Sequence, residues 1–459
     1  MRWTSSFPRA WTCVLGANMV WAGVGGLASA ACIDEDKPIA VLMVEPGTPL
    51  PPEPRVALVN MVRDALGRSR AVGATQLLAE AALNDIDEAR AAKALQASVG
   101  GEVGPSVSQS VGITSSSSLH VRGSISVTQL LYDGGRIDRL TDWRTQLAES
   151  ARLGHLSNQE QIALNTVALG LERSRFRQHV LVYGQYVRKM ACLVEALETI
   201  VRADRGRASE LVQAKKSLQQ AELAQHQALS QVRQVETRLR RFVGDGLPSV
   251  QGMSSLLLEV PDLGLIEGEV TRSTDMAQLA AQAAAMGQYA AAVASGDKPQ
   301  LSWTFGGSKS LAAGGGGGGG GVDQRSANLG LGILVNIPLA NPGVAPAAEA
   351  ARKRAQAAQL QREDALESRR YRAREVHEQT LSAFDRATRL GGVLRESDQV
   401  RNFTLQQWQQ LGKRSMFDVM SAEGEHYNLR VAHINAMHDG QQMNAVLLSL
   451  GRGVAEWLR

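Results

Sequence analysis

The sequence predicts an α+β membrane protein in which each chain contributes four strands to a closed transmembrane β-barrel and also carries very long helices. Three observations predict this class. Two pairs of segments alternate with period 2, the helical patterns are far longer than those of globular domains, and the order of elements occurs twice. Only 4% of the 459 residues are aromatic, which favours long helices over a compact aromatic core.

Residues 1–30 read as a cleaved export signal. Arg2 and Arg9 precede an apolar stretch over residues 11–27, and Ala28-Ser29-Ala30 follows it. The alternative is a retained membrane helix. The stretch is short for a span and contains Asn18, and no second spanning segment follows.

The sequence allows two ways of processing the chain at the end of the export signal. Cys32 could be a lipidated first residue, although Ser29 stands where a lipobox has a Leu-like side chain; the alternative is ordinary cleavage after Ala30 or Ala31. Because Cys13 lies in the signal and Cys192 in a helical segment, the sequence predicts no disulfide framework.

The first repeat is predicted over residues 55–250, after a Pro-rich lead at 31–54 that serves as a tether or a strap. A helical pattern leads to two strands, at about 103–113 and 121–132, which form a hairpin. Their apolar positions alternate with small polar ones: Val107, Val111 and Ile113 with Ser106, Ser108 and Ser110, then Val121, Ile125, Val127 and Leu131 with Arg122, Ser124, Ser126 and Thr128.

Two long helices are predicted after this hairpin, at about 137–203 and 207–243. At 1.5 Å per residue, the first would be on the order of 100 Å long. Gly244-Asp245-Gly246-Leu247-Pro248 ends the second. Helices of this length need a packing partner along their whole length.

The same order recurs over residues 273–459, after a linker predicted at 251–272. Strands are expected at about 299–307 and 327–339 and long helices at about 346–408 and 416–457. Gly135 corresponds to Gly343, and Gly206 to Gly412, both at offsets of about 207 residues, which indicates an internal duplication. Between the second strand pair, Gly314–Gly321 is eight consecutive glycines; no Gly-Lys-Ser/Thr follows, so an exposed loop is favoured over a phosphate-binding loop.

Four strands of this kind cannot make a barrel alone. Each is long enough to cross the hydrocarbon layer at a tilt, but in lipid every backbone polar group must be paired, so an open sheet is excluded. Three chains would supply a closed twelve-stranded barrel, with the Ser and Thr face toward a water-filled lumen. A soluble sandwich would explain the alternation equally well, but it would not explain an export signal together with the long helices.

These segments resemble the TolC family over nearly the whole chain after the lead, the glycine tract excepted. Gln129-Leu130-Leu131-Tyr132-Asp133-Gly134-Gly135-Arg136-Ile137 is similar to that family's entry into its long periplasmic helix. Val335-Asn336-Ile337-Pro338-Leu339, followed by Gly343, is the counterpart in the second repeat, and Ile86-Asp87-Glu88-Ala89-Arg90 resembles the helix before the first strand. The resemblance implies a homotrimer whose outer-membrane barrel continues as a long α-helical barrel in the periplasm.

The strongest local match lies at the turns between the long helices. Leu411-Gly412-Lys413-Arg414-Ser415-Met416-Phe417-Asp418-Val419 resembles the family's periplasmic tip turn, and its partner in the first repeat is Arg205-Gly206-Arg207-Ala208-Ser209-Glu210-Leu211-Val212-Gln213-Ala214. Glu210 takes the acidic position of the first turn if that turn is two residues shorter than usual.

In that family the tips close the duct, so the resemblance implies a gate. By position, Arg414 corresponds to the gating arginine and Asp418 to the first acid of a constricting ring. The family's second acid falls at Ser421, with Glu423 nearby, and its gate tyrosine falls at Gln409. Asp418 can equally be a helix N-terminal acid that stabilises its own dipole, and both roles are compatible.

The function implied is the exit duct of a tripartite export system, not an enzyme. The expected partners are outer-membrane lipid, a periplasmic adaptor (membrane fusion protein) and an inner-membrane ABC transporter or RND pump. Type I protein secretion is favoured, drug or small-molecule efflux is the runner-up, and a structural trimeric coiled-coil surface protein is the alternative of another class.

Other classes find no support in the residues. The net charge is only +4 and the basic residues are interspersed with acidic ones, which argues against nucleic acid as a partner. No nucleophile motif or cofactor fingerprint occurs. His426, His433 and His438 are spaced too irregularly along one helix to form a metal site, so neither metal nor cofactor is expected.

Overall fold

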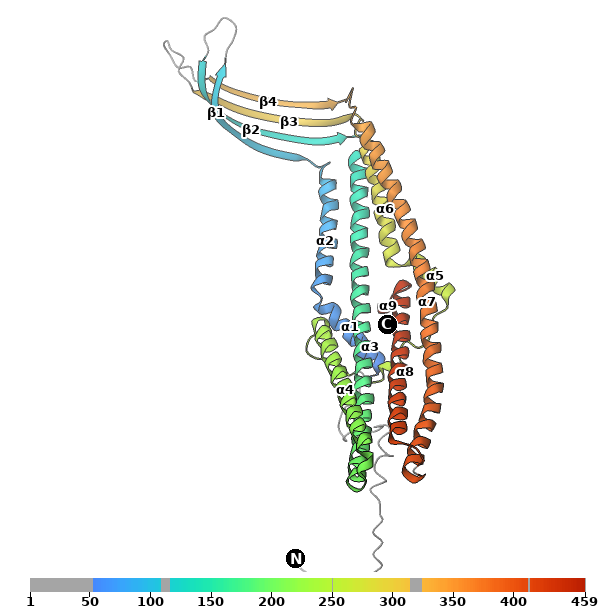
Figure 1. Ribbon diagram of the computed structural model, residues 1–459. Helices are drawn as coiled ribbons and strands as arrows, with labels where there is room; N and C mark the ends of the chain where they lie inside the picture. Colours follow the sequence, from blue (N-terminus) through green and yellow to red (C-terminus); the bar gives the residue numbers. More distant parts are fainter. Residues whose placement is uncertain (1–52, 109–115, 250, 314–323, 412, 459) are drawn as a thin grey trace, which may run out of the picture. The chain divides into compact units, whose positions relative to one another are not determined.

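The computed structural model describes residues 53–108, 116–249, 251–313, 324–411 and 413–458, and it is mostly helical with one four-stranded sheet (Figure 1). Several predicted features lie outside these residues: the export signal, all but the end of the Pro-rich lead, Cys32, Gly314–Gly321 and Gly412. The elements are, in chain order, α1 (Pro54–Arg68), α2 (Arg70–Ala91), β1 (Gln96–Ser108), β2 (Ser116–Tyr132), α3 (Arg136–Ala203), η2 (Arg205–Arg207), α4 (Ala208–Val243), η3 (Met253–Ser255), α5 (Leu263–Arg272), α6 (Thr274–Val293), β3 (Gln300–Ala313), β4 (Gln324–Asn336), α7 (Val344–Leu411), α8 (Met416–Leu450) and α9 (Val454–Leu458).

The four strands lie side by side in the order β1-β2-β3-β4, and every neighbouring pair is antiparallel. β2 is therefore paired on both sides, and so is β3. β1 and β4 are the two edges of the sheet, and each has one side that pairs with no other described strand. Edges of this kind expose a row of backbone N–H and C=O groups.

The strand register places most of the apolar residues on one face, although Leu130 and Leu334 flank Ser302 on the other. Ile125 stands opposite Val99, Val127 opposite Phe305, and Phe305 in turn opposite Leu331. On the other face Ser126 stands opposite Ser98, with their hydroxyl oxygens 2.7 Å apart. Gly307 leaves room on the apolar face because a Cβ there would meet the Ile125 and Leu329 side chains at 3.2 and 3.3 Å. Apart from these two leucines, the register agrees with the predicted division into an apolar and a small polar face.

The strand boundaries differ from the prediction. β1 starts at Gln96, earlier than expected, and β3 continues to Ala313 instead of ending near residue 307. The pattern of alternating apolar and polar residues is interrupted at Gly306 and Gly307, which have no side chains. It continues beyond them at Ser308 and Leu311. β4 ends at Asn336 instead of residue 339; Pro338 has no N–H to donate to a ladder.

A sharp corner joins β2 to α3. The Asp133 side chain is buried and accepts hydrogen bonds from the N–H groups of Gly135 (3.0 Å) and Ile137 (2.6 Å). Gly134 and Gly135 have φ angles of +71° and +81°, a region that favours glycine. A Cβ on Gly134 would also clash with the Lys298 side chain. This explains the Asp-Gly-Gly sequence at the end of the strand.

The chain divides into two compact units. The smaller comprises residues 183–225 and 397–427, and the larger comprises the other described residues. The larger unit has an apolar core in which α1 packs on α3, α4 and α8; its largest fully buried members include Leu58, Met61, Leu171 and Leu239. The smaller unit has a separate core that includes Met190, Leu193, Leu197, Trp408 and Met416.

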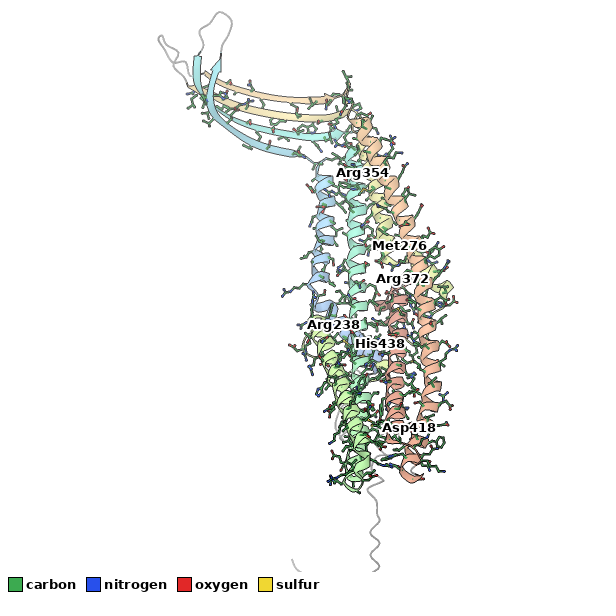
Figure 2. The ribbon with its side chains drawn as sticks, in the orientation of Figure 1. Arg238, Met276, Arg354, Arg372, Asp418 and His438 are labelled. Carbon is green, nitrogen blue, oxygen red and sulfur yellow. The ribbon has the colours of Figure 1, made fainter. Side chains whose placement is uncertain are left out.

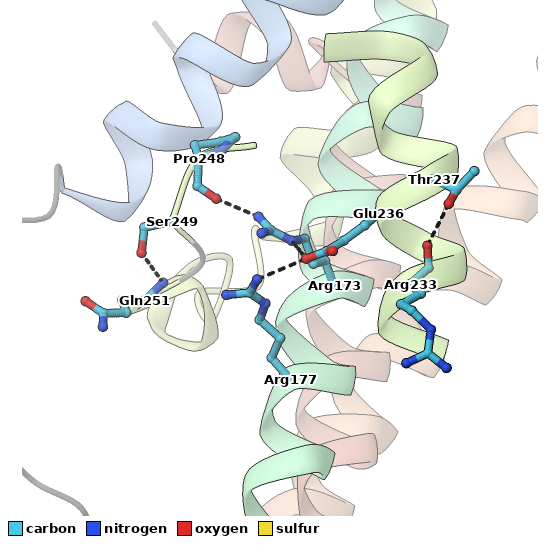
Figure 3. A network of polar contacts seen from close by, with 8 residues as sticks. All are labelled: Arg173, Arg177, Arg233, Glu236, Thr237, Pro248, Ser249 and Gln251. Carbon is cyan, nitrogen blue, oxygen red and sulfur yellow. Dashed lines mark hydrogen bonds and ion pairs between the residues drawn. The ribbon is translucent and has the colours of Figure 1, made fainter. Parts of the chain in front are cut away.

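A partly buried ion-pair network joins α3 to α4 in the larger unit (Figure 3). Glu236 accepts from Arg173 Nε (2.8 Å) and Arg177 Nη2 (3.0 Å), and Arg173 also donates to the carbonyl of Pro248 (2.5 Å). Burial alone would raise the pKa of Glu236, but the hydrogen bonds from the two arginines lower it below its usual value. The network holds the segment after α4 against α3.

The predicted helix over residues 416–457 is wrong at its C-terminal end. α8 stops at Leu450 and a separate short helix, α9, follows. Gly453 has a φ of +105°, which a helix cannot contain. Glu160 accepts from the first two backbone N–H groups of α9, and Arg369 donates to the carbonyls of the last two residues of α8. The two side chains thus satisfy both ends of the break.

The predicted linker at 251–272 also contains structure, because α5 occupies its second half. Asp262 caps this helix by accepting from the N–H groups of Gly264 (2.8 Å) and Leu265 (3.2 Å). Ile266 and Val270 are buried in a cluster with residues of α7 and α8. The segment is part of the core of the larger unit.

Two further findings concern the helices. No described helix is both long and apolar enough to cross a membrane. Cys192, on α3, is disulfide-bonded, whereas the sequence predicted no disulfide framework.

Candidate functional site

The first turn of the smaller unit joins α3 to α4. Asp204 accepts from the Gly206 N–H (2.9 Å) through its side chain and from the Arg207 N–H (3.3 Å) through its carbonyl, which stops α3 and starts η2. Glu210 lies in the first turn of α4, and its Oε2 is buried without a hydrogen-bond partner in the described structure. The predicted turn at Gly206 and the placement of Glu210 beside it therefore agree with the structure.

The second turn joins α7 to α8 and is built around Ser415 and Asp418. Figure 2 labels Asp418 near the start of α8. The Asp418 N–H donates to Ser415 Oγ (3.3 Å), and the Ser415 N–H donates to Asp418 Oδ2 (3.2 Å). This reciprocal pair is a capping box with Asp in the third position. Asp418 is therefore a helix-capping acid.

Asp418 also faces a cation from its own chain. Arg414 Nη1 lies 3.9 Å from Asp418 Oδ2, and Arg414 Nε donates to Gln407 Oε1 (3.1 Å). Both charged side chains are about half exposed, so this pair contributes little to stability. The neighbouring Phe417 is exposed and Gln409 is half-buried. The structure thus brings Arg414 and Asp418 together on an accessible surface.

Glu423 lies in a different environment. Its side chain is fully buried and forms ion pairs with Lys189 Nζ on α3 (3.6 Å) and Arg401 Nη1 on α7 (3.5 Å). Both cations are almost completely buried as well, and Arg401 also pairs with Asp398 (2.7 Å). The cluster ties three helices of the smaller unit together, and the Glu423 carboxylate points into its own chain instead of onto the surface that Asp418 occupies.

An aromatic pair adjoins the buried ion cluster. The rings of Tyr186 and Tyr427 are 4.7 Å apart, and a Cβ on Gly424 would lie 3.2 Å from the Tyr186 hydroxyl. Burial raises the pKa of Tyr186, and the Glu423 carboxylate raises it further. Tyr186 therefore stays neutral and packs beside the charges.

Lys189 and Arg401 were absent from the predicted site, although the sequence contained a signal for them. Met416, Val419 and Met420 form an apolar stripe on α8, and Glu423 continues it at helical spacing. Arg401 likewise precedes Leu405 and Trp408 at helical spacing. A charge on a buried stripe calls for a buried counter-charge on a facing helix.

Two buried histidines lie in the larger unit, outside both turns. Burial lowers the pKa of His438 on α8 to about 3, with added repulsion from Arg175 and His179. Burial also lowers the pKa of His179 on α3 to about 4, with repulsion from Arg175 opposed by a hydrogen bond with Asn435. Both rings are thus neutral in the folded chain at neutral pH, and neither ring nitrogen of His438 has a hydrogen-bond partner among the described residues.

We expect these histidines to make the chain acid-sensitive. The histidines of the unfolded chain bind protons near pH 6.5, whereas those of the folded chain bind them only near pH 4 and 3. The histidines' contribution to the free energy of unfolding is therefore complete above pH 6.5 and is lost as the pH falls toward 4 and 3. At pH 5 each histidine should lower the free energy of unfolding by about 2 kcal/mol relative to neutral pH. Urea unfolding followed by circular dichroism at the two pH values measures this, and His438→Leu should remove about half of the loss. An equal loss in that variant would contradict the assignment.

The comparisons with known proteins concern the fold. No family model matches the sequence, and no curated protein matches it. Among solved structures, the chain is similar to CusC, with a TM-score of 0.76 at 15% identity over 86% of this chain and 92% of that one. It is also similar to the outer-membrane channel OprN (TM-score 0.72, 16% identity, 86% and 89% covered). The outer membrane protein VceC from Vibrio cholerae is similar as well, with a TM-score of 0.71 at 16% identity over 87% of this chain and 96% of that one. The chain therefore has the fold of outer-membrane channels, as the resemblance implied.

Proposed function

We propose that the chain is one third of an outer-membrane exit duct that extends into the periplasm. The observation that carries this proposal is the open antiparallel sheet, which has one exposed apolar face and two unpaired edges. An exposed apolar face suits lipid, and edges are tolerated in lipid only if another chain pairs with them. β1 of one chain would pair with β4 of the next, and three copies would close a twelve-stranded barrel.

The polar face would line the lumen of this barrel. Ser98, Ser126 and Ser310 lie on it, and Arg122 stands directly opposite Glu102. Small hydroxyl side chains and paired opposite charges suit a water-filled passage. The fold neighbours include proteins described as outer-membrane channels, which supports the same location for this chain.

The duct would end at the two turns of the smaller unit. Three copies of Asp418 around one axis would form a ring of negative charge, favouring cations at a narrow point. Arg414, which lies beside Asp418 and bonds to Gln407 in the same chain, would hold the second turn closed. Glu210 would contribute an acid from the first turn. Glu423 would stabilise the helices behind the ring instead of lining it.

We expect Asp418→Ala to reduce cation selectivity and block by divalent cations in planar bilayers, because it removes three charges from a poorly solvated point. Assembly should be nearly unchanged, since an exposed acid in the first turn of a helix contributes only about 0.3–1 kcal/mol. Glu425→Ala, which removes an exposed acid from the same helix, is the control and should leave selectivity intact. Unchanged selectivity in Asp418→Ala would place the constriction elsewhere.

Arg414→Ala should act differently from Asp418→Ala. Loss of the Gln407 contact loosens the turn, so single-channel conductance should rise while cation selectivity is preserved. Cells that carry this variant should become permeable to large antibiotics. A fall in selectivity with unchanged conductance would assign the two residues the opposite roles.

The cargo we favour is a protein passed on by an inner-membrane ABC transporter through a periplasmic adaptor. The Tyr132-Asp133-Gly134-Gly135 corner resembles the secretion branch of the TolC family more than the drug or small-molecule efflux branch. Deletion of the gene followed by mass spectrometry of the culture medium tests the choice. Loss of one secreted protein supports secretion, whereas a full set of secreted proteins with new drug sensitivity favours efflux through an RND pump. A structural surface protein would give neither result and no conductance.

A further inference from the structure

The apolar face of the sheet carries two cations near its hairpin end. Lys309 on β3 stands opposite Ala327, and Arg325 on β4 stands opposite Leu311, so both lie on the face of Ile125 and Val127. Both side chains are exposed. No hydrogen bond or ion pair joins either of them to another residue in the described ranges.

The two cations are close neighbours. Arg325 is two residues from Ala327, the direct partner of Lys309, so the two residues are diagonal neighbours on adjacent strands, with backbone positions about 7–8 Å apart. The described strand residues on this face include no Asp or Glu, and Glu102 lies on the opposite face. Like charges on neighbouring strand positions repel each other, and a bound anion would relieve that repulsion.

The position of the two cations along the strands corresponds to the edge of the apolar band. A cation on the lipid face costs about 2–4 kcal/mol near the midplane but almost nothing at the interface. On β4, every residue on this face between Val335 and Arg325 is uncharged. At a strand tilt of about 40°, the rise from Val335 to Arg325 is about 26 Å along the membrane normal. This height is close to the ~25 Å of an outer-membrane apolar band. Trp303 and Tyr132 lie at the other end of the sheet, where an aromatic girdle is expected.

We propose that Lys309 and Arg325 together bind the phosphate of an anionic lipid headgroup at the outer rim of the barrel. The proposal rests on the proposed function, because it requires this face to lie in lipid. A guanidinium pairs with two phosphate oxygens at once, while the lysine ammonium adds a point charge from the neighbouring strand. The long apolar stems of both residues lie along the hydrophobic band and bring the charges up to headgroup level.

The test measures lipid preference in the assembled protein. Assembly is first checked as a heat-sensitive oligomer band after insertion into phosphatidylcholine vesicles. Binding of fluorescent phosphatidylglycerol, competed by phosphatidylcholine, is then compared for wild type, Lys309→Gln, Arg325→Gln and the double variant. Each single change should weaken phosphatidylglycerol binding about fivefold and the double change about 25-fold. Arg122→Gln, which removes a cation from the polar face of β2, should have no effect.

The outcomes separate the two proposals. No insertion or oligomer in phosphatidylcholine would mean that the proposed function is wrong. Wild type that assembles without preferring phosphatidylglycerol, or a double variant that keeps the preference, would overturn the lipid site alone. An equal loss in Arg122→Gln would also overturn it, because general positive charge would then explain the binding.

Discussion

Ile125→Arg will abolish the heat-sensitive oligomer, whereas Ser126→Arg, one residue further along β2, will leave it assembled. Ile125 is exposed on the apolar face beside Val99, so an arginine there places its charge in lipid. Each copy should cost about 2–4 kcal/mol near the midplane, and a trimer carries three copies. Ser126 lies on the polar face, where its replacement loses only the contact with Ser98, worth about 1 kcal/mol.

The two variants differ in face but not in charge, size or depth, so they control for each other. Oligomer yield in outer-membrane fractions, on gels run with and without heating, is the measurement. Equal loss in both variants would mean that the sheet does not divide lipid from lumen. Ile333→Arg on β4 repeats the test from the other edge and should match Ile125→Arg.

The second large effect is expected at the buried ion cluster. Glu423→Gln leaves Lys189 and Arg401 without their shared buried carboxylate, and removing one partner of such a pair costs about 3–5 kcal/mol. Because the chain has two compact units, the loss should be local. Amide hydrogen exchange should speed up over residues 183–225 and 397–427 while the sheet remains protected.

Glu425→Gln is the matched control, since it neutralises an exposed acid two residues away on α8. It should leave exchange in both units unchanged. Faster exchange in both variants would show that net charge matters instead of the buried pairing. Unchanged exchange in Glu423→Gln would show that the cluster does not hold the helices together.

The strands and long helices could be predicted from the sequence because each has its own period. The alternation in β2 and the uninterrupted pattern of α3 are long enough to outweigh local exceptions. The prediction was wrong where a few residues override the period. Gly306 and Gly307 hid the second half of β3, and Gly453 ended a helix that apolar spacing alone would continue.

The candidate site was predicted in part. The turn that carries Arg414 and Asp418 could be found because a glycine and a capping sequence mark it locally. Glu423 was grouped with the turn because it is close in sequence. Its partners, Lys189 and Arg401, come from two other helices, and only the three-dimensional packing shows that they meet.

We propose that several copies of this chain together make one closed barrel. Light scattering of the purified protein in mild detergent, corrected for bound detergent, gives the number of chains. Because β1 and β4 each have an edge that pairs with no other described strand, we expect a mass of three chains that falls to one chain only after heating in SDS. A stable monomer in mild detergent would contradict the account, because its sheet edges would then have no partner in lipid.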